Sequence, residues 1–309
     1  MNPPAHLCRF RLWALSAAFV LVLIAVLTPR GARSQAAAAT AQPSPRARHV
    51  FIISFDGGKP SVMKQSRMPT LFGMVRRGAG TWEARTVFPS ITLPSHTSML
   101  TGVDIPKHGI TWNDWRPEKG SLTVPTIFAL ARARKMTTAL FAGKEKFIHL
   151  NVPGTLDTFS VPSYSAKKVA QVAAAHIETV KPNLCFVHFA DPDGAGHASG
   201  WGSREQIAAF ADSDAALKTV LTAIERAGIA RESVVLISAD HGGHGKTHGT
   251  NAPDDMIIPW IAWGAGVRPG YAITAPVTTY DTAATALWLL GVPVPAGFDG
   301  KPVTSAFTP

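Results

Sequence analysis

The sequence predicts an α/β protein, a three-layer α/β/α sandwich with a mostly parallel central sheet. Apolar runs of strand length alternate along the chain with segments of helical length and pattern. The strand-like runs are continuously apolar, which is typical of strands that are buried on both faces of a sheet. Strands that alternate with helices favour parallel pairing, because each helix carries the chain back across the sheet.

Five strands and six helices are expected in order along the chain. The strand-like runs occupy Val50–Phe55, Met136–Phe141, Leu184–Ala190, Val234–Ala239 and Ile257–Trp263. The helical patterns occupy Met68–Arg77, Pro94–Thr101, Val124–Lys135, Ala166–Val180, Arg204–Ala227 and Asp281–Leu290. The fifth helix has the clearest ends, since Ser203 and Gln206 match a capping box and Gly228 is a typical stop. No repeat and no linker after residue 49 divides the sequence, so residues 49–309 are expected to form a single domain.

The composition excludes several classes of protein. The chain has 309 residues, of which 46% are hydrophobic and 16% charged, so it is neither disordered nor collagen-like. Two cysteines cannot form a zinc ribbon or a disulfide framework. Any metal would therefore have to be held by Asp and His side chains.

The first 34 residues have the layout of a secretory signal peptide. Arg9 and Arg11 precede the uncharged apolar run Leu12–Leu27, and small residues follow it. The run has 16 residues, fewer than the roughly 20 that a membrane-spanning helix needs. Residues 35–48 are rich in Ala, Pro and Ser, which indicates a flexible tether. We expect a periplasmic or secreted protein; an uncleaved leader, which would leave the chain membrane-anchored and facing outward, is the alternative.

The net charge of +10 is partly a property of this leader, which contains four arginines and no acidic residue. The rest of the chain has 26 basic and 20 acidic residues, spread without a long run of one sign. A basic protein attracts small anionic ligands. Nucleic acid is not expected as a partner, because the sequence contains no Cys/His finger, basic helix or aromatic RNA-binding pattern.

Acidic and imidazole side chains follow several of the expected strands. Asp56 comes directly after the first, and Asp240 and His241 come directly after the fourth. Asp191, Asp193 and His197 follow the third, while His244 and His248 lie a few residues beyond His241. Ligands of open α/β sheets bind outside the carboxyl ends of the strands. Asp and His together suit zinc, so these strand ends are candidate metal ligands.

Thr92 is the candidate nucleophile. Pro94 is placed at the first turn of a helix, where its missing N–H costs nothing. Thr92 would then lie just before that helix. The free amides and the dipole of a helix N-terminus favour an anion such as an alkoxide or a phosphoryl oxygen. Taken alone, the threonine could equally be an ordinary helix cap.

In this order the motifs resemble those of the alkaline phosphatase superfamily, and within it the type I phosphodiesterase/nucleotide pyrophosphatase family. The resemblance spans roughly residues 49–303. It rests on Asp56-Gly57, Phe88-Pro89-x-x-Thr92-x-Pro94-x-His96, His108-Gly109-Ile110 with Asn113, Pro192-Asp193-x-x-Gly196-His197, Ser238-x-Asp240-His241-Gly242, His248-Gly249 and Asp299-Gly300-Lys301-Pro302.

The resemblance implies two zinc ions, with manganese or iron as alternatives. Asp193, His197 and His248 would hold one ion, and Asp56, Asp240, His241 and the Thr92 oxygen would hold the other. His248 matches the family pattern better than His244, and Asp193 has the better spacing to His197 than Asp191. Asn113 and the Leu93 amide would bind phosphoryl oxygens while a phosphothreonine forms at Thr92 and is then hydrolysed.

Lys144 and Lys146 bear on the charge of the substrate. They follow the second expected strand, and alternate residues of an extended segment point the same way. The pair looks like the phosphate-binding basic pair of threonine-nucleophile alkaline phosphatases, which would favour a monoester; both could equally be exposed turn residues. Trp112 and Trp115 flank Asn113 and would either stack on a substrate ring or belong to the core.

The sequence therefore predicts an exported two-zinc hydrolase of small phosphate esters, either a phosphodiesterase acting on substrates such as nucleotides or an alkaline phosphatase. A phosphonate hydrolase or a phosphoryl-group transferase of the same superfamily is the alternative. A sulfatase is disfavoured, because Thr92 cannot become formylglycine. A binding protein that retains the metal site without catalysis is the remaining alternative.

Overall fold

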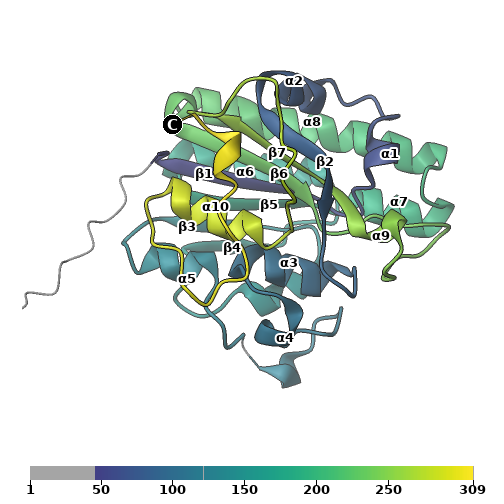
Figure 1. Ribbon diagram of the computed structural model, residues 1–309, viewed down its shortest axis with the longest axis horizontal. Coiled ribbons are helices and arrows are strands. Elements are labelled where there is room, and N and C mark those ends of the chain that lie inside the picture. The colour runs from purple at the N-terminus through teal and green to yellow at the C-terminus, as the bar shows by residue number, and fades with distance from the viewer. Residues whose placement is uncertain (1–45, 121, 309) are drawn as a thin grey trace, which may run out of the picture. The chain divides into compact units, whose positions relative to one another are not determined.

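The computed structural model describes residues 46–120 and 122–308, which form an α/β fold around one eight-stranded sheet (Figure 1). The strands are β1 (His49–Phe55), β2 (Ala79–Arg85), β3 (Thr138–Phe141), β4 (Thr158–Ser160), β5 (Leu184–Phe189), β6 (Ser233–Ala239), β7 (Ile257–Gly264) and β8 (Tyr271–Ala272). Their order across the sheet is β4-β3-β5-β1-β6-β7-β2-β8. Only β7 runs against its neighbours, since it pairs antiparallel with β6 and β2 while the other pairs are parallel. The predicted mostly parallel sheet is confirmed.

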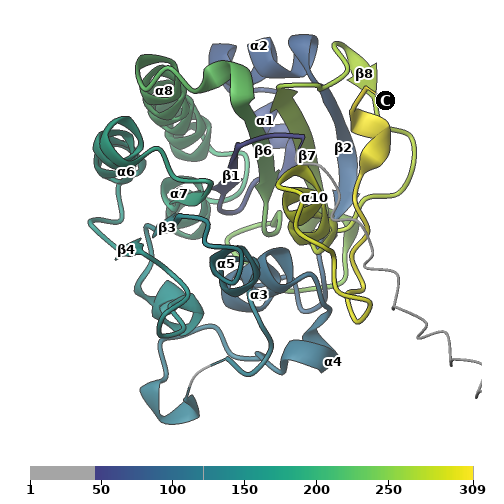
Figure 2. The same cartoon turned by 90° about the vertical axis from the view of Figure 1, so that its left-hand side faces the viewer.

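The ten α-helices of the described residues surround this sheet (Figure 2). They are α1 (Pro60–Met63), α2 (Pro69–Arg77), α3 (Thr92–Thr101), α4 (Ile105–His108), α5 (Ile127–Arg132), α6 (Ala166–Val180), α7 (Asp191–Ser199), α8 (Arg204–Arg226), α9 (Pro253–Met256) and α10 (Asp281–Leu289). There are also four short 3-10 helices, η1 (Pro117–Lys119), η2 (Glu145–Leu150), η3 (Ala230–Glu232) and η4 (Thr304–Ala306). None of these helices is both long enough and apolar enough to cross a membrane.

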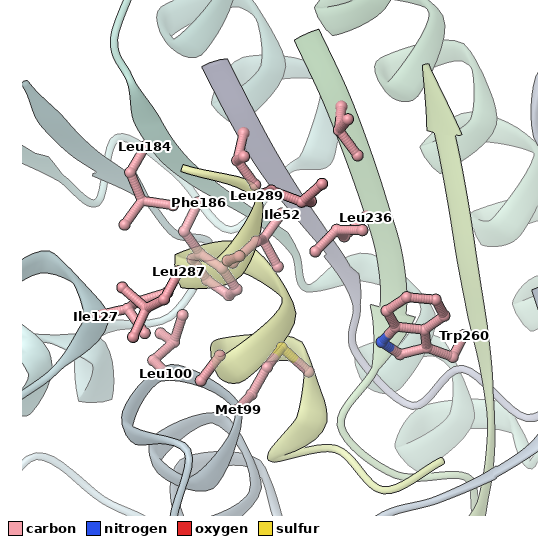
Figure 3. Close-up of a cluster of buried hydrophobic side chains, with 14 of the residues drawn as sticks. Ile52, Met99, Leu100, Ile127, Leu184, Phe186, Leu236, Trp260, Leu287 and Leu289 are labelled. Carbon is pink, nitrogen blue, oxygen red and sulfur yellow. The ribbon is translucent and has the colours of Figure 1, made fainter. Parts of the chain in front are cut away.

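Two hydrophobic cores cover the two faces of the sheet, because successive strand residues point to opposite sides. In β1, Ile52 points into the core that α3, α5 and α10 complete (Figure 3). Phe51 and Ile53 point into the other core, which includes side chains of α2, α6 and α8. All seven residues of β1 are buried, as expected for a central strand of a three-layer sandwich.

The predicted strands and helices agree with the structure except at certain ends. The helix expected over Val124–Lys135 is only α5, since Thr126 caps its start and Lys135 adopts a left-handed backbone with φ 60°. The sequence contains no strand pattern for β2, which includes Gly80 and is only partly buried. It gave no helix pattern for α7, where two glycines and Pro192 lower the helix propensity.

The predicted leader, residues 1–34, and residues 35–45 of the predicted tether lie outside the described residues. The signal peptide, the membrane anchor and this part of the tether therefore stay predictions, whereas residues 46–48 are held by backbone hydrogen bonds to Leu289 and Glu232 and do not form a flexible tether. The chain enters the fold at Arg46, whose N–H donates to the carbonyl of Leu289 at the end of α10.

Candidate active site

The carboxyl ends of the central strands bring the predicted metal ligands together. In the described residues two groups could each hold a cation, with ligand atoms within 4.8 Å of one another: Asp193, His197 and His248 form one, and Asp56, Asp193 and His241 form the other. Asp56 follows β1, while Asp193 and His197 lie on α7 directly after β5. His241 lies two residues after β6. The parallel register explains the juxtaposition, since Phe55 pairs with both Phe189 and Ala239 at the strand ends.

Each of the three imidazoles presents its Nε2 atom to this cluster. His197 Nδ1 lies 3.0 Å from the carbonyl oxygen of Lys246, His241 Nδ1 2.8 Å from that of Gly242, and His248 Nδ1 2.9 Å from that of Ser90. A carbonyl can only accept, so Nδ1 carries the proton in all three rings. The lone pair of each ring therefore lies on Nε2. This backbone support of the far nitrogen is typical of metal-binding histidines.

Within the part of the chain that the structure describes, three carboxylates each leave one buried oxygen without a hydrogen-bond donor: Asp56 Oδ1, Asp193 Oδ1 and Asp240 Oδ2. These oxygens lie 3.5, 4.0 and 3.2 Å from His241 Nε2. Asp193 Oδ1 also lies 3.4 Å from His197 Nε2 and 3.6 Å from His248 Nε2. Unpartnered buried oxygens are costly unless a cation binds them. The donor set of the chain therefore fits a cluster of divalent cations of the zinc class.

The other oxygen of each carboxylate is used by the protein. Lys144 Nζ lies 2.6 Å from Asp56 Oδ2 and 2.5 Å from Asp193 Oδ2. Asp56 Oδ2 also accepts from His188 Nε2 at 2.8 Å. Asp240 Oδ1 accepts the backbone N–H groups of Gly57 and His241. One oxygen of each carboxylate is thus held in place, and the other is left facing the cluster.

Burial and neighbouring charges shift the pKa values of this cluster in opposite directions. Burial alone would raise the pKa of Asp56, but the Lys144 ammonium and His188 hold it well below its ordinary value. Burial, followed by the Asp56 carboxylate, raises the pKa of Asp240 well above its ordinary value. Burial and the neighbouring His248 lower the pKa of His241 to about 4. Three carboxylates thus face one ammonium, so the cluster favours additional positive charge.

Thr92 is the first residue of α3, and Ile91 is the N-cap, so the threonine lies inside the helix rather than just before it. Its Oγ1 atom lies 3.4 Å from His241 Nε2 and 3.4 Å from Lys144 Nζ. The hydroxyl therefore lies against the cluster, between an imidazole and an ammonium. Its backbone carbonyl is held by the buried His96, whose Nδ1 lies 2.8 Å away.

Leu93 does not have the free amide that was predicted to bind a phosphoryl oxygen. Its N–H donates to Asn113 Oδ1 at 2.9 Å. This hydrogen bond fixes the orientation of the Asn113 amide, because the oxygen is the accepting end. The NH2 group of Asn113 remains as the donor for a ligand.

A cavity of about 650 Å³ opens over this cluster. Twelve residues line it: Thr92, Asn113, Asp114, Trp115, Gly143, Lys144, Glu145, Lys146, Tyr164, Asp193, His197 and His248. Lys144 and Lys146 both line the cavity. The prediction that an extended segment aligns the two side chains is wrong. Lys146 lies in the 3-10 helix η2, because the chain turns immediately after Lys144.

The two lysines differ in their surroundings. The side chain of Lys144 is 10% exposed and pairs with two carboxylates. No carboxylate of the described residues lies within ion-pair distance of Lys146. Burial and the nearby Lys144 charge lower the pKa of Lys146. Lys146 is therefore the ammonium of this wall that remains available to an anionic ligand.

The structure places the alternative ligands elsewhere. His244 Nδ1 pairs with Asp255 Oδ1 at 2.7 Å, whereas His248 lies in the cluster. Asp191 Oδ2 accepts the N–H of Ala166 at the start of α6, whereas Asp193 faces the imidazoles. Trp112 packs partly against the core, and Trp115 lines the cavity.

The sequence did not single out several residues that support the site. His188 lies in the apolar run of β5 and accepts the Gly143 N–H at Nδ1, so its Nε2–H donates to Asp56. Tyr164 reaches the cavity from the segment before α6 and is 47% exposed. His149 lies in η2 next to Trp112 and Trp115. The only sign of these residues in the sequence is a single histidine within an apolar strand. That sign identifies His188 and neither of the other two.

The fold and this strand-end cluster define an alkaline phosphatase-like α/β protein. A family model described as type I phosphodiesterase / nucleotide pyrophosphatase matches residues 50–252. The chain belongs to this family of the alkaline phosphatase superfamily, as the motifs predicted.

Curated relatives include a Bos taurus bis(5'-adenosyl)-triphosphatase, ENPP4, which is 23% identical over 213 residues (62% of this chain and 47% of that protein). A Homo sapiens ectonucleotide pyrophosphatase/phosphodiesterase family member 5 is 23% identical over 216 residues (64% and 45%). A 2,3-bisphosphoglycerate-independent phosphoglycerate mutase of Synechococcus elongatus is 31% identical over 151 residues (45% and 27%). The chain thus spans about half the length of the first two relatives and less of the mutase.

Solved structures resemble this fold across most of the chain. Inactive murine ectonucleotide pyrophosphatase/phosphodiesterase 5 in complex with AMP has a TM-score of 0.72 at 14% identity, covering 84% of this chain and all of that one. A 2-O GAG sulfatase has a TM-score of 0.68 at 16% identity, covering 84% and 74%. Both structural similarities are evidence about the fold alone.

Proposed function

We propose that the chain is a two-zinc phosphate-ester hydrolase that works through a phosphothreonine at Thr92. The observation that carries this proposal is the position of the Thr92 hydroxyl. It lies at the start of α3 and 3.4 Å from His241 Nε2, and that nitrogen lies within 4.0 Å of three carboxylate oxygens that have no donor in the described residues. Membership of the type I phosphodiesterase / nucleotide pyrophosphatase family supports the reaction class.

The chain would hold the cations with side chains of the two groups described above together with Asp240, whose Oδ2 atom lies 3.2 Å from His241 Nε2. Asp193, His197 and His248 would bind one, and Asp56, Asp240 and His241 the other, with Asp193 near both. When bound, two such cations would supply Lewis acidity to the nucleophile and to the leaving oxygen. Zinc is proposed because the donors are imidazole nitrogens and carboxylate oxygens, and manganese and iron accept similar sets.

The protein's own groups would position and stabilise the reacting phosphoryl group. Thr92 Oγ1 forms the new bond to phosphorus as the bond to the leaving oxygen breaks, and the hydroxyl proton is released to solvent. Lys144 Nζ, 3.4 Å from this oxygen, stabilises its negative charge. The Asn113 NH2 group donates to an equatorial phosphoryl oxygen. Water then attacks phosphorus, which restores Thr92 and releases phosphate or the remaining monoester.

We propose a small phosphate ester as the substrate. The unpaired Lys146 ammonium in the cavity wall favours a monoester, which carries one more negative charge than a diester. Trp115 and Tyr164 offer aromatic surface to an aryl or base group. A relative acts on bis(5'-adenosyl)-triphosphate by name, and a structural neighbour was solved with AMP, so nucleotides are the first compounds to test.

Export from the cytoplasm is part of the proposal. The leader layout of residues 1–34 would direct the chain out of the cytoplasm, where it would act in the periplasm or as a secreted protein. N-terminal sequencing of the mature protein tests this directly. A start after residue 34 or nearby supports cleavage, and a start at Met1 contradicts it.

The reaction is tested by replacing Thr92 and a matched control on the same helix. Thr92→Ala should abolish hydrolysis of p-nitrophenyl phosphate and bis-p-nitrophenyl phosphate, while bound zinc stays near two per chain. Thr97→Ala is the control, because Thr97 is also buried on α3 and its hydroxyl donates only to the Leu93 carbonyl. Unchanged activity of Thr92→Ala would remove the threonine as nucleophile. Inactivity of the wild-type chain on both esters would favour a phosphonate substrate or a transferase.

A further inference from the structure

The loop that carries Asn113 contains no regular structure between Gly109 and Arg116. Even so, it forms one wall of the cavity through Asn113, Asp114 and Trp115. A side chain that must meet a phosphoryl oxygen has to be held to within a fraction of an ångström. The loop therefore needs contacts beyond the single hydrogen bond from Leu93 N–H to Asn113 Oδ1.

His149 supplies such contacts from η2. Its Nε2 atom accepts the indole N–H of Trp112 at 3.2 Å and the backbone N–H of Arg116 at 2.9 Å. These donors lie on either side of Asn113 in the loop. The ring is 3% exposed and packs against Trp112 and Trp115, with ring centroids 5.5 and 4.5 Å away.

His149 is also part of the segment that carries the lysines. It lies in η2, whose N-cap is Lys144 and whose second residue is Lys146. One imidazole therefore connects the Asn113 wall of the cavity to the lysine wall. A shift of either wall breaks both hydrogen bonds at the same nitrogen.

We propose that His149 is a positioning residue that fixes the Asn113 loop relative to η2 for the reaction. The inference rests on the proposed function only in its kinetic consequence. The geometry also requires a particular tautomer, which can be measured without any substrate.

The tautomer follows from the two donors. Nε2 can accept both N–H groups only when its lone pair is free, so the ring proton lies on Nδ1. Nδ1 is buried and makes no hydrogen bond of normal geometry in the described residues, although the carbonyls of Asp114 and Gly120 lie near the ring. A buried donor without a partner is costly, so the ring is held in this form by what Nε2 binds.

The charged groups around the ring agree with a neutral imidazole. Burial lowers the pKa of His149, and Glu118 and the carbonyls of Asp114 and Gly120 oppose this shift. The Arg116 guanidinium pairs with Asp114, and the Lys119 ammonium lies over the Trp112 ring. Protonation of Nε2 would place its N–H against the N–H groups of Trp112 and Arg116. Both hydrogen bonds would then be lost, and the loop would no longer be held in place.

The experiment uses the full chain and three substitutions. His149→Leu removes the acceptor, and His149→Gln keeps an oxygen near the position of Nε2. His176→Leu is the matched control, because His176 lies on α6 beside Phe141 and does not line the cavity. Long-range ¹H–¹⁵N spectra of the histidine rings and the indole N–H signal of Trp112 report the hydrogen bonds without substrate.

We expect His149 to carry its proton on Nδ1, and the Trp112 indole signal to move in His149→Leu but little in His149→Gln. Catalytic efficiency should fall about tenfold in His149→Leu, mainly through kcat, and should be largely restored in His149→Gln. His176→Leu should match the wild type.

A double-mutant comparison separates positioning from a general structural role. Asn113→Ala should reduce kcat/KM by about 100-fold, and adding His149→Leu should then cost little more. A proton on Nε2, an unmoved Trp112 signal in His149→Leu, or the same tenfold loss in the Asn113→Ala background would each overturn the inference. If Asn113→Ala has full activity, the proposed role of Asn113 fails, while the ring spectra still decide how the loop is held.

Discussion

The cation-binding cluster and the Asn113 loop form two sides of the same cavity, but the fold positions them in different ways. Asp56 and Asp240 each follow the last residue of neighbouring parallel strands, and the register of β1 and β6 places them together. Asn113 lies in a loop without regular structure, which the His149 side chain of η2 and the backbone N–H of Leu93 in α3 hold in place. Backbone hydrogen bonds of the sheet determine the first region, and a few side-chain hydrogen bonds determine the second.

This difference predicts how each region responds to change. A strand end cannot move without breaking the buried sheet, so substitutions in the cluster should remove ligands while leaving the rest of the site in place. The loop has few backbone bonds to the rest of the fold, so substitutions that only loosen it should reduce activity without changing cation binding.

Removing the carboxylate that both cation groups share should have the largest effect. Asp193→Asn should release both cations and reduce kcat/KM by about 10³-fold or more, because Asp193 belongs to both groups. Asp240→Asn should release one cation only. The measurement is zinc content per chain by elemental analysis, alongside turnover of p-nitrophenyl phosphate.

The control for this comparison is Asp214, another buried carboxylate, which stabilises the fold and lies outside the cluster. Asp214 accepts the N–H groups of Thr70 and Leu71 at the start of α2, away from the cavity. Asp214→Asn should lower stability but keep two cations per chain. Equal loss of zinc in the Asp214 and Asp193 variants would show that the cluster depends on overall stability rather than on the shared ligand.

Lys146, in the cavity wall, should affect selectivity between monoesters and diesters more than it affects catalysis as such. Lys146→Met should lower kcat/KM for p-nitrophenyl phosphate about tenfold more than for the corresponding diester, because it removes one charge from the cavity wall. Lys146→Arg should preserve the ratio, and Lys119→Met is the control, since Lys119 lies over Trp112 and does not line the cavity. Equal losses on both esters would mean that Lys146 does not sense the charge of the substrate.

The smallest effect at neutral pH concerns His108, at the start of the Asn113 loop. Its Nδ1 accepts the Ile110 N–H, and burial lowers its pKa from 6.5 to about 4. Between these values the unfolded chain binds more protons than the folded chain. Stability from this group is therefore complete above pH 6.5, is lost as pH falls toward 4, and amounts to about 3 kcal/mol at most.

Urea unfolding of chelator-treated protein at pH 8 and pH 5 measures this effect, because chelation removes the pH dependence of cation binding. The wild type should lose more stability between the two values than His108→Gln. The same loss in both proteins would assign the pH dependence to other groups.

The sequence predicted the strand-end region well and the loop region poorly, for physical reasons. Asp56, Asp193, Asp240 and His241 could be found because a buried parallel strand has a recognisable pattern and its carboxyl end has a known place in the fold. Their combination with a threonine before a helix then matched a family.

Contacts between distant side chains leave no such pattern. Nothing in the spacing of Trp112 and His149 shows that they share a hydrogen bond, and nothing in Leu93 shows that its N–H binds Asn113 rather than a ligand. Lys144 and Lys146 were expected to point the same way from an extended segment, but the chain turns into η2 between them. Such details depend on the packing of whole elements, which single-sequence patterns do not encode.

The central claim is that Thr92 becomes phosphorylated during turnover. The most direct test is to quench the zinc-loaded full chain in acid during turnover of p-nitrophenyl phosphate and to map phosphorylation by peptide mass spectrometry. We expect one added phosphoryl group on Thr92, which is absent in Thr92→Ala and present in Thr97→Ala. Sustained turnover with no covalent phosphate, or with phosphate on a different residue, would contradict it.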